Sequence, residues 1–234
     1  SRGLGDVYKR QVYNSYWRFA AERQKVFRKR LFSEALPWTS DPIICSYKFT
    51  NAYRASDRVS QYLIRNVIYR SDLCDSHEEV VFRILLFKFF NKIETWQLLE
   101  RELGQVSYRD YKFETYDKVL SQAMRGGGRI YSAAYIMPPG SSAFGYSAKH
   151  QNHLKLLERM MEQKLPEILR KLPNMQQAFE LIRSYPTIGN FLAYQFVTDI
   201  NYSEVTGFSE MEFVVPGPGA VSYTHLTLPT TPYV

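Results

Sequence analysis

The chain has 234 residues, of which 45% are hydrophobic and 15% aromatic, so it contains enough apolar surface to form a packed core. Its formal net charge is +7, which permits a polyanionic partner without requiring one. The sequence contains no uncharged apolar run of the length that a membrane-spanning helix needs. Its two cysteines, Cys45 and Cys74, lie far apart, which argues against a disulfide scaffold and favours a reducing compartment.

The two ends of the chain differ from its middle. Residues 1–11 and 221–234 resemble translated sequencing-adapter sequence of the kind that flanks reading frames in metagenomic assemblies, and neither has a core-forming period. We expect both to be non-native, with disordered natural tails as the alternative. We therefore expect one helical domain over residues 12–220, truncated at its C-terminal side. Without the ends, 27 basic and 22 acidic residues leave a net charge of +5.

Two amphipathic helices are expected first. Residues 17–36 alternate apolar and basic positions and predict a helix that ends before Pro37. Its basic face is either solvated or lies along a nucleic-acid backbone. After a connector over residues 38–54, valine and leucine recur at four-residue intervals and predict a core-facing helix over residues 55–69.

The next stretch, residues 78–104, is apolar around most of a helical circumference and predicts one long buried helix. Three polar residues, Arg83, Lys88 and Asn91, interrupt it. A buried polar group needs a partner because its desolvation is otherwise uncompensated. That partner is either a neighbouring backbone carbonyl or a substrate.

The second half of the chain also predicts helices. Residues 113–125 form one that stops at three glycines, Gly126–Gly128. A helix C-cap is favoured there over a phosphate cradle, because no Gly-Lys-Ser/Thr follows. Residues 129–137 are expected to be extended and 138–149 to form a loop. Two further helices are predicted over residues 150–172 and 175–185.

Residues 178–200 resemble a helix-hairpin-helix element, with "PTIG" as the hairpin. In such an element, backbone N–H groups of the hairpin and of the second helix face a DNA phosphate, which makes Gly189 and Asn190 candidate DNA-binding residues. We expect Gly189 to supply a close approach or a positive φ. Thr187 stands where the usual hairpin has its first glycine, and a plain helix turn is the alternative. Phe191 occupies the lysine position of glycosylases that act as lyases, so no Schiff-base chemistry is expected.

Five ordered blocks carry a more specific resemblance: "KFTNAYRASDRVSQYLI", "FRILLFKFFNKIETWQLLE", "IYSAAYIMPPG", "IGNFLAYQFVTDINYS" and "EMEFVVPGPGA". Together they resemble the helical domain found with 5-hydroxymethyluracil DNA kinases, within the group named alpha-glutamyl/putrescinyl thymine pyrophosphorylases, over residues 41–220. The resemblance implies a mainly α fold similar to helix-hairpin-helix DNA glycosylases. It also implies phage-type DNA hypermodification, in which a pyrophosphorylated 5-hydroxymethyluracil receives an amine or amino acid and loses pyrophosphate.

Two alternative functions remain open at this point. One is a non-catalytic DNA-binding domain that accompanies a 5-hydroxymethyluracil DNA kinase, and the other is a glycosylase that releases a modified base. The expected partners are DNA with a modified pyrimidine and a P-loop kinase domain or protein, since the chain itself has no Walker motif. Apart from an amine or amino acid co-substrate no cofactor is expected, and Cys74 and His77 lack the further ligands of a metal site. The expected location is the cytoplasm of a bacterial or phage-infected cell, or the nucleus of a eukaryote.

The implied reaction must extrude a base, hold it, balance the charge of pyrophosphate and take a proton from an amine. Asp199 is the candidate general base, although it could instead cap a helix end. Asn201 and Tyr202 are candidates to orient the base edge, and Glu212 is a second carboxylate candidate.

Two further groups of side chains complete the expected site. Candidates to grip phosphate oxygens gather at the start of the first block: Asn51, Tyr53, Arg54, Arg58 and Gln61. The alternative for these is an exposed face paired with Asp57. Candidates to contact the extruded base close the central helix: Asn91, Thr95 and Trp96.

Overall fold

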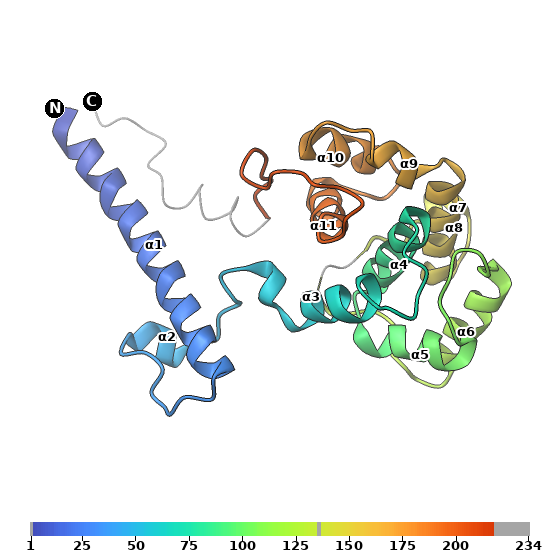
Figure 1. Ribbon diagram of the computed structural model, residues 1–234, viewed down its shortest axis with the longest axis horizontal. Coiled ribbons are helices and arrows are strands. Elements are labelled where there is room, and N and C mark those ends of the chain that lie inside the picture. The colour runs from blue at the N-terminus through green and yellow to red at the C-terminus, as the bar shows by residue number, and fades with distance from the viewer. Residues whose placement is uncertain (1, 135–136, 218–234) are drawn as a thin grey trace. The chain divides into compact units, whose positions relative to one another are not determined.

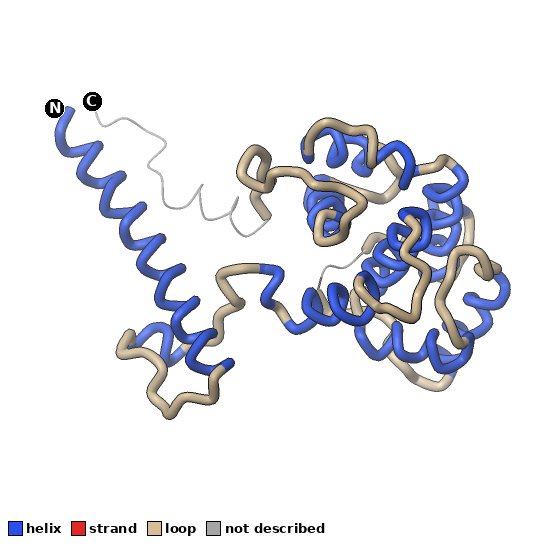
Figure 2. The backbone as a smooth tube through the Cα atoms, in the orientation of Figure 1, coloured by secondary structure: helices blue, strands red, loops and turns tan. Residues whose placement is uncertain are grey.

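A computed structural model describes residues 2–134 and 137–217 of the chain. The described residues form helices joined by turns and loops, with no strand among them (Figure 2). This confirms the mainly α fold class. None of the described helices has the length and apolar character to cross a membrane. The chain divides into two compact units, residues 1–61 and 62–234.

The first unit contains two α-helices, a short 3-10 helix and the start of a third α-helix (Figure 1). Their bounds are α1 (Arg2–Leu31), α2 (Pro42–Ser46), η1 (Arg54–Ser56) and α3 (Arg58–Tyr62). The expectation of a helix over residues 17–36 was wrong at both ends, since α1 begins at Arg2 and ends at Leu31. The chain turns at Ser33, whose φ is 55°. The turn is closed by the Glu34 N–H, which donates to the Lys29 carbonyl at 2.9 Å.

The segment that follows α1 folds back onto it through polar contacts. The Arg23 guanidinium donates from Nε to the Thr50 carbonyl at 3.0 Å and from Nη2 to the Asn51 carbonyl at 3.1 Å. The Thr39 hydroxyl donates to the Glu22 carboxylate at 2.8 Å. The first unit is therefore held by side chains of α1 that bind backbone and hydroxyl groups of residues 39–51.

The second unit is built around one central helix (Figure 1). It contains the short π-helix η2 (Leu63–Ile68). Its α-helices are α4 (His77–Phe90), α5 (Ile93–Leu103), α6 (Phe113–Arg125), α7 (Ser141–Phe144), α8 (Lys149–Glu162), α9 (Leu165–Leu169), α10 (Met175–Arg183) and α11 (Asn190–Ile200). Helix α4 packs against η2, α8, α9 and α11, and all but its first two residues are buried. Burial on every side explains why its sequence lacks an amphipathic period.

The expected long helix over residues 78–104 is in fact two helices, so that expectation was wrong. The chain breaks at Asn91, which adopts a left-handed conformation with φ 48° and ψ 38° and donates its N–H to the Phe87 carbonyl. Asparagine tolerates this conformation better than most residues. Asn91 is therefore the C-cap of α4 and lets α5 leave in a new direction.

Two other expected elements are confirmed. Helix α6 ends at a C-cap built by the three glycines: Gly126 and Gly128 donate to carbonyls of the last turn at 3.0 and 2.9 Å, and Gly127 has a φ of 80°. Helices α10 and α11 pack against each other and are joined by the short turn over residues 184–189. Residues 129–134 of the segment expected to be extended form no strand, and residues 135–136 lie outside the described residues.

Candidate functional site

A buried ion pair joins the central helix to α11. The Lys88 Nζ lies 2.8 Å from the Asp199 Oδ2, and the two side chains are 3% and 2% exposed. Removing two charges from water costs several kcal/mol each, which only close mutual attraction and further hydrogen bonds can offset. The partner of Lys88 is therefore a side-chain carboxylate of α11, and not the backbone carbonyl or the substrate that the sequence led us to expect.

Arg83, one helical turn and a half before Lys88, is held by a different set of groups. Its Nε donates to the Val67 carbonyl at 3.0 Å and its Nη1 to the Cys74 carbonyl at 2.9 Å. The buried Glu79 carboxylate lies 3.9 Å from the guanidinium and accepts hydrogen bonds from residues 107–109. Burial lowers the pKa of Arg83, against the attraction of Glu79. These contacts give Arg83 a structural role. Its partners are backbone carbonyls, the first of the two alternatives expected from the sequence.

The residues expected beside Asp199 hold a surface loop together. The Asn201 amide donates to the Phe208 carbonyl at 3.0 Å and accepts from the Thr206 hydroxyl and the Phe208 N–H at 3.1 and 2.9 Å. The Tyr202 carbonyl accepts from the Tyr69 hydroxyl at 3.1 Å. Asn201 thus uses its amide within residues 201–208, so a role in orienting a base requires that this loop rearrange.

Glu212, the second carboxylate candidate, is exposed, whereas Asp199 is buried. Its neighbour Phe213 packs against Phe179 and Tyr194, with ring centroids 5.2 and 6.1 Å apart. The segment that carries Glu212 is therefore anchored on α10 and α11.

The residues expected to contact an extruded base are all buried in the second unit. Asn91 caps α4, and the Thr95 hydroxyl donates to the Ile130 carbonyl at 2.7 Å. Trp96 is 1% exposed and packs edge-on against Phe87, with centroids 6.0 Å apart. In this structure the Asn91 backbone caps α4, and the Thr95 and Trp96 side chains hold α5 against neighbouring segments.

The candidates to grip phosphate lie in the first unit, and their amide groups are used locally. The Asn51 amide donates to the Ser56 carbonyl at 2.9 Å, and the Gln61 amide donates to the Ala55 carbonyl at 2.7 Å. Burial raises the pKa of Asp57, and the nearby Arg54 charge opposes that rise. Tyr53 and Arg58 are exposed, and Asn51, Arg54 and Gln61 are half-buried.

The turn between α10 and α11 departs from the expectation in one respect. Gly189 has a φ of −84°, so the positive φ expected there was wrong. Thr187 adopts it instead, with a φ of 68°, at the position where the usual hairpin has its first glycine. A Cβ added at Gly189 would meet nothing within 4 Å. The Asn190 side chain accepts from Arg183 at 3.2 Å, which ties the two helices together across the turn.

Replacing Thr187 with glycine is expected to stabilise the protein by roughly 0.5–1 kcal/mol. The left-handed conformation costs an L-residue about 1–2 kcal/mol, and glycine escapes that cost while losing some backbone entropy. The free energy of unfolding in urea measures the change. Thr187→Ala is the matched control, because it keeps the strained φ and loses the side chain. A glycine variant as unstable as the alanine variant would show that the Thr187 methyl packing outweighs the strain.

A second polar cluster, which the sequence analysis missed, lies between α6 and α8. The His150 Nε2 is 2.7 Å from the Asp117 Oδ1 and 3.0 Å from the Ser121 hydroxyl. A nucleophilic triad requires the serine and the carboxylate at opposite ring nitrogens, and here both lie at the same nitrogen. Asp117 also accepts from Gln151 at 3.0 Å; burial raises its pKa, but these hydrogen bonds outweigh that and lower it. The cluster therefore joins two helices and does not match a triad.

His153, one turn further along α8, is buried and neutral. Its Nε2 donates to the Pro138 carbonyl at 2.8 Å, and its Nδ1 accepts from the Tyr131 hydroxyl at 2.8 Å. Burial lowers the pKa of His153 to about 4. Its ring stacks on that of Phe89, with centroids 5.8 Å apart. Phe89 is the residue that follows Lys88 in α4. The i, i+3 spacing of His150 and His153 could have indicated that both face the core.

Comparison with known proteins agrees with the resemblance seen in the sequence. The family described as "5-hmdU DNA kinase, helical domain" matches residues 10–230. A protein of Bacillus phage SP10 named "5-hmdU DNA kinase" is 26% identical over 214 residues, which cover 86% of this chain and 33% of that protein. The chain thus spans about a third of the length of this relative. No solved structure matches. The chain belongs to the family of 5-hmdU DNA kinase helical domains.

Proposed function

We propose that this domain acts on DNA whose thymines carry 5-hydroxymethyluracil-derived groups, and that it transfers an amine or amino acid to a pyrophosphorylated base. Family membership over residues 10–230 is the observation that carries the DNA thymine-modification part of the proposal. The buried pair of Lys88 and Asp199 supports the choice of chemistry, because it brings an acid–base couple into the middle of the fold.

The reaction fits the two side chains as follows. The amine nitrogen attacks the 5-methylene carbon and forms a C–N bond, while the C–O bond breaks and its electron pair leaves with pyrophosphate. The nitrogen must then lose a proton, which Asp199 accepts. Lys88, already beside that carboxylate, balances the negative charge of the departing pyrophosphate.

This proposal includes an opening step. Both side chains are almost completely buried, so a base can reach them only if DNA binding moves α11 away from α4 at this point. Enzymes that act on a base in DNA extrude it into a pocket, and the energy of DNA binding would drive that opening.

A specific observation favours a second candidate function. A fully buried ion pair is also what a structural contact between two helices looks like, and the chain spans about a third of a relative that is named a kinase. A non-catalytic domain that positions DNA for a P-loop kinase domain satisfies both facts. In that case the reaction belongs to the kinase part of the longer protein.

Nucleoside mass spectrometry separates these candidates. DNA that contains pyrophosphorylated 5-hydroxymethyluracil is incubated with the chain and a mixture of amino acids and polyamines, and its nucleosides are then analysed. We expect a mass gain on the modified base that equals the added amine. Unchanged DNA that is still bound supports the positioning domain, and release of a free base indicates a glycosylase.

A further inference from the structure

The net charge of the chain is unevenly distributed between the two units. Residues 1–61 contain 12 basic and 5 acidic residues, whereas residues 62–234 contain 18 of each. The whole formal charge of +7 therefore resides in the first unit. A local excess of Lys and Arg attracts polyanions far more strongly than the same charge spread over a surface.

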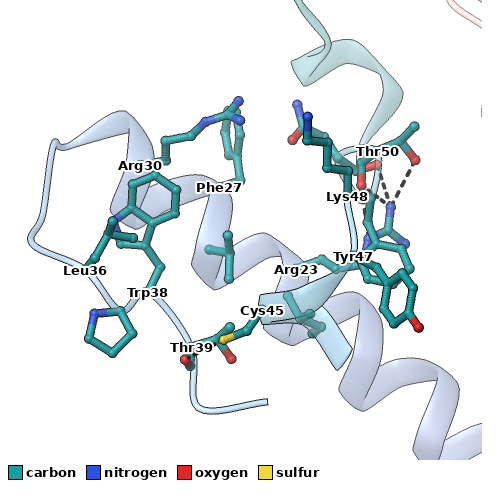
Figure 3. A pocket seen from close by; sticks show the side chains of 15 residues that line it. Arg23, Phe27, Arg30, Leu36, Trp38, Thr39, Cys45, Tyr47, Lys48 and Thr50 are labelled. Carbon is teal, nitrogen blue, oxygen red and sulfur yellow. Dashed lines mark hydrogen bonds between the residues drawn. The ribbon is translucent and has the colours of Figure 1, made fainter. Parts of the chain in front are cut away.

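A pocket of about 500 Å³ opens in this basic unit (Figure 3). Its walls are the C-terminal half of α1 on one side and residues 36–51 on the other. Three of the described lining residues are cationic, Arg23, Arg30 and Lys48, and none is Asp or Glu. The pocket is thus suited to an anion.

The walls of this pocket are held in place by the protein. Arg23 binds the carbonyls of Thr50 and Asn51 and lies over the Phe49 ring, 6.0 Å from its centroid. The Trp38 indole N–H donates to the Glu34 carbonyl at 2.9 Å, which holds the edge of the ring in place. A ligand would therefore meet a preformed site with little ordering cost.

Two of the three cations remain available to a ligand. Arg30 from the last turn of α1 and Lys48 from the opposite wall extend on either side of the opening (Figure 3). Neither forms an ion pair with a residue in the described part of the chain. A phosphate between them would receive two charge-assisted contacts.

Aromatic rings supply the remaining chemistry of the pocket. Among the described residues, the rings that line it are those of Phe27, Trp38, Tyr47 and Phe49. Tyr47 and Phe49 are 67% and 43% exposed, although burying rings of this size would be favourable. Cationic grooves interleaved with aromatic rings are the usual way to bind single-stranded nucleic acid, because every base offers a face for stacking.

We propose that this pocket binds one unpaired nucleotide of a DNA strand, with the base against Trp38 and its aromatic neighbours and the phosphate between Arg30 and Lys48. The volume of about 500 Å³ lies within the roughly 300–1,000 Å³ typical of small-ligand sites. The inference does not depend on the transfer chemistry proposed above, since a strand can be held without being modified. The same chemistry would also accept a free nucleotide.

Fluorescence anisotropy of a labelled oligothymidine with the full chain tests the charged half of this site. Arg30→Glu with Lys48→Glu is expected to weaken binding by at least about tenfold. The matched control is Arg28→Glu with Lys29→Glu, which makes the same charge change in the same helical turn outside the pocket lining. We expect the control to weaken binding by no more than about threefold. Equal losses in both variants would overturn the proposal.

Tryptophan emission tests the aromatic half without disturbing it. Trp17→Phe leaves Trp38 and Trp96, and Trp96 is buried in the second unit, so quenching by a stacked base reports on Trp38. We expect oligothymidine to quench this emission, and Trp38→Leu, checked for folding by circular dichroism, to lose about tenfold in affinity. Competition by thymidine monophosphate at equal affinity would identify a free nucleotide as the natural ligand. DNA binding that leaves the Trp38 emission unchanged would overturn the proposal.

Discussion

Replacing Lys88 with methionine is expected to lower the free energy of unfolding by about 3–5 kcal/mol. The substitution keeps most of the side-chain volume and removes the ammonium group that lies 2.8 Å from the Asp199 carboxylate. That carboxylate would then stay buried without the cation that balances it, and a buried uncompensated charge is among the most costly defects in a protein. Urea denaturation of the variant and the parent measures the loss.

Two further variants separate the ion pair from a general effect of losing a charge. Lys118→Met, at an exposed position of α6, should change stability by less than about 0.5 kcal/mol. Lys88→Met combined with Asp199→Leu removes both charges, and we expect it to recover most of the stability that either single variant loses, because an apolar pair of similar volume can replace a buried ion pair. A double variant whose loss equals the sum of the single losses would show that the two charges do not act as a pair.

The second large effect is a dependence of stability on pH that comes from His153. Burial lowers the pKa of this histidine to about 4 in the folded protein, against about 6.5 in an unfolded chain. Between these two values the unfolded state binds the extra proton, so stability is fully present above pH 6.5 and is lost as the pH falls toward 4. The contribution of His153 over this window is about 3 kcal/mol.

Unfolding free energies of the parent and of His153→Gln, measured between pH 4 and pH 7.5, test this. Glutamine offers a donor and an acceptor to the Pro138 carbonyl and the Tyr131 hydroxyl but does not titrate. The difference in unfolding free energy between the two proteins should shrink as the pH falls, because only the parent loses the contribution of His153. The carboxylates contribute equally to both curves and cancel from the difference. His77→Gln controls for the replacement of a histidine elsewhere. Parallel curves for the parent and His153→Gln would mean that His153 is not held neutral by its surroundings.

The parts of the fold that sequence could predict are those that local signals determine. The three glycines after α6 and the proline and glycine between α10 and α11 mark helix ends, and apolar spacing marks buried faces. The break at Asn91 was not predicted, because nothing in the surrounding apolar sequence indicates a left-handed residue there. The start of α1 was not predicted either, because its first residues lack a core-forming period.

The candidate site was less predictable, because it depends on contacts between distant segments. The sequence singled out both residues separately. Lys88 is a charge in a helix predicted to be buried, and Asp199 is a carboxylate near the end of another predicted helix. Their pairing appears only when α4 and α11 pack together. The left-handed Thr187 was missed for a related reason, since a β-branched residue in that conformation runs against intrinsic preference.

The most direct test of the account compares the parent chain with Asp199→Asn in the nucleoside mass-spectrometry assay. Asparagine keeps the shape of the side chain and removes its capacity to accept a proton. We expect the parent to add an amine to the pyrophosphorylated base, and Asp199→Asn to bind the same DNA without forming product. Equal product from both proteins, or none from the parent, would contradict the assignment of Asp199 to the reaction.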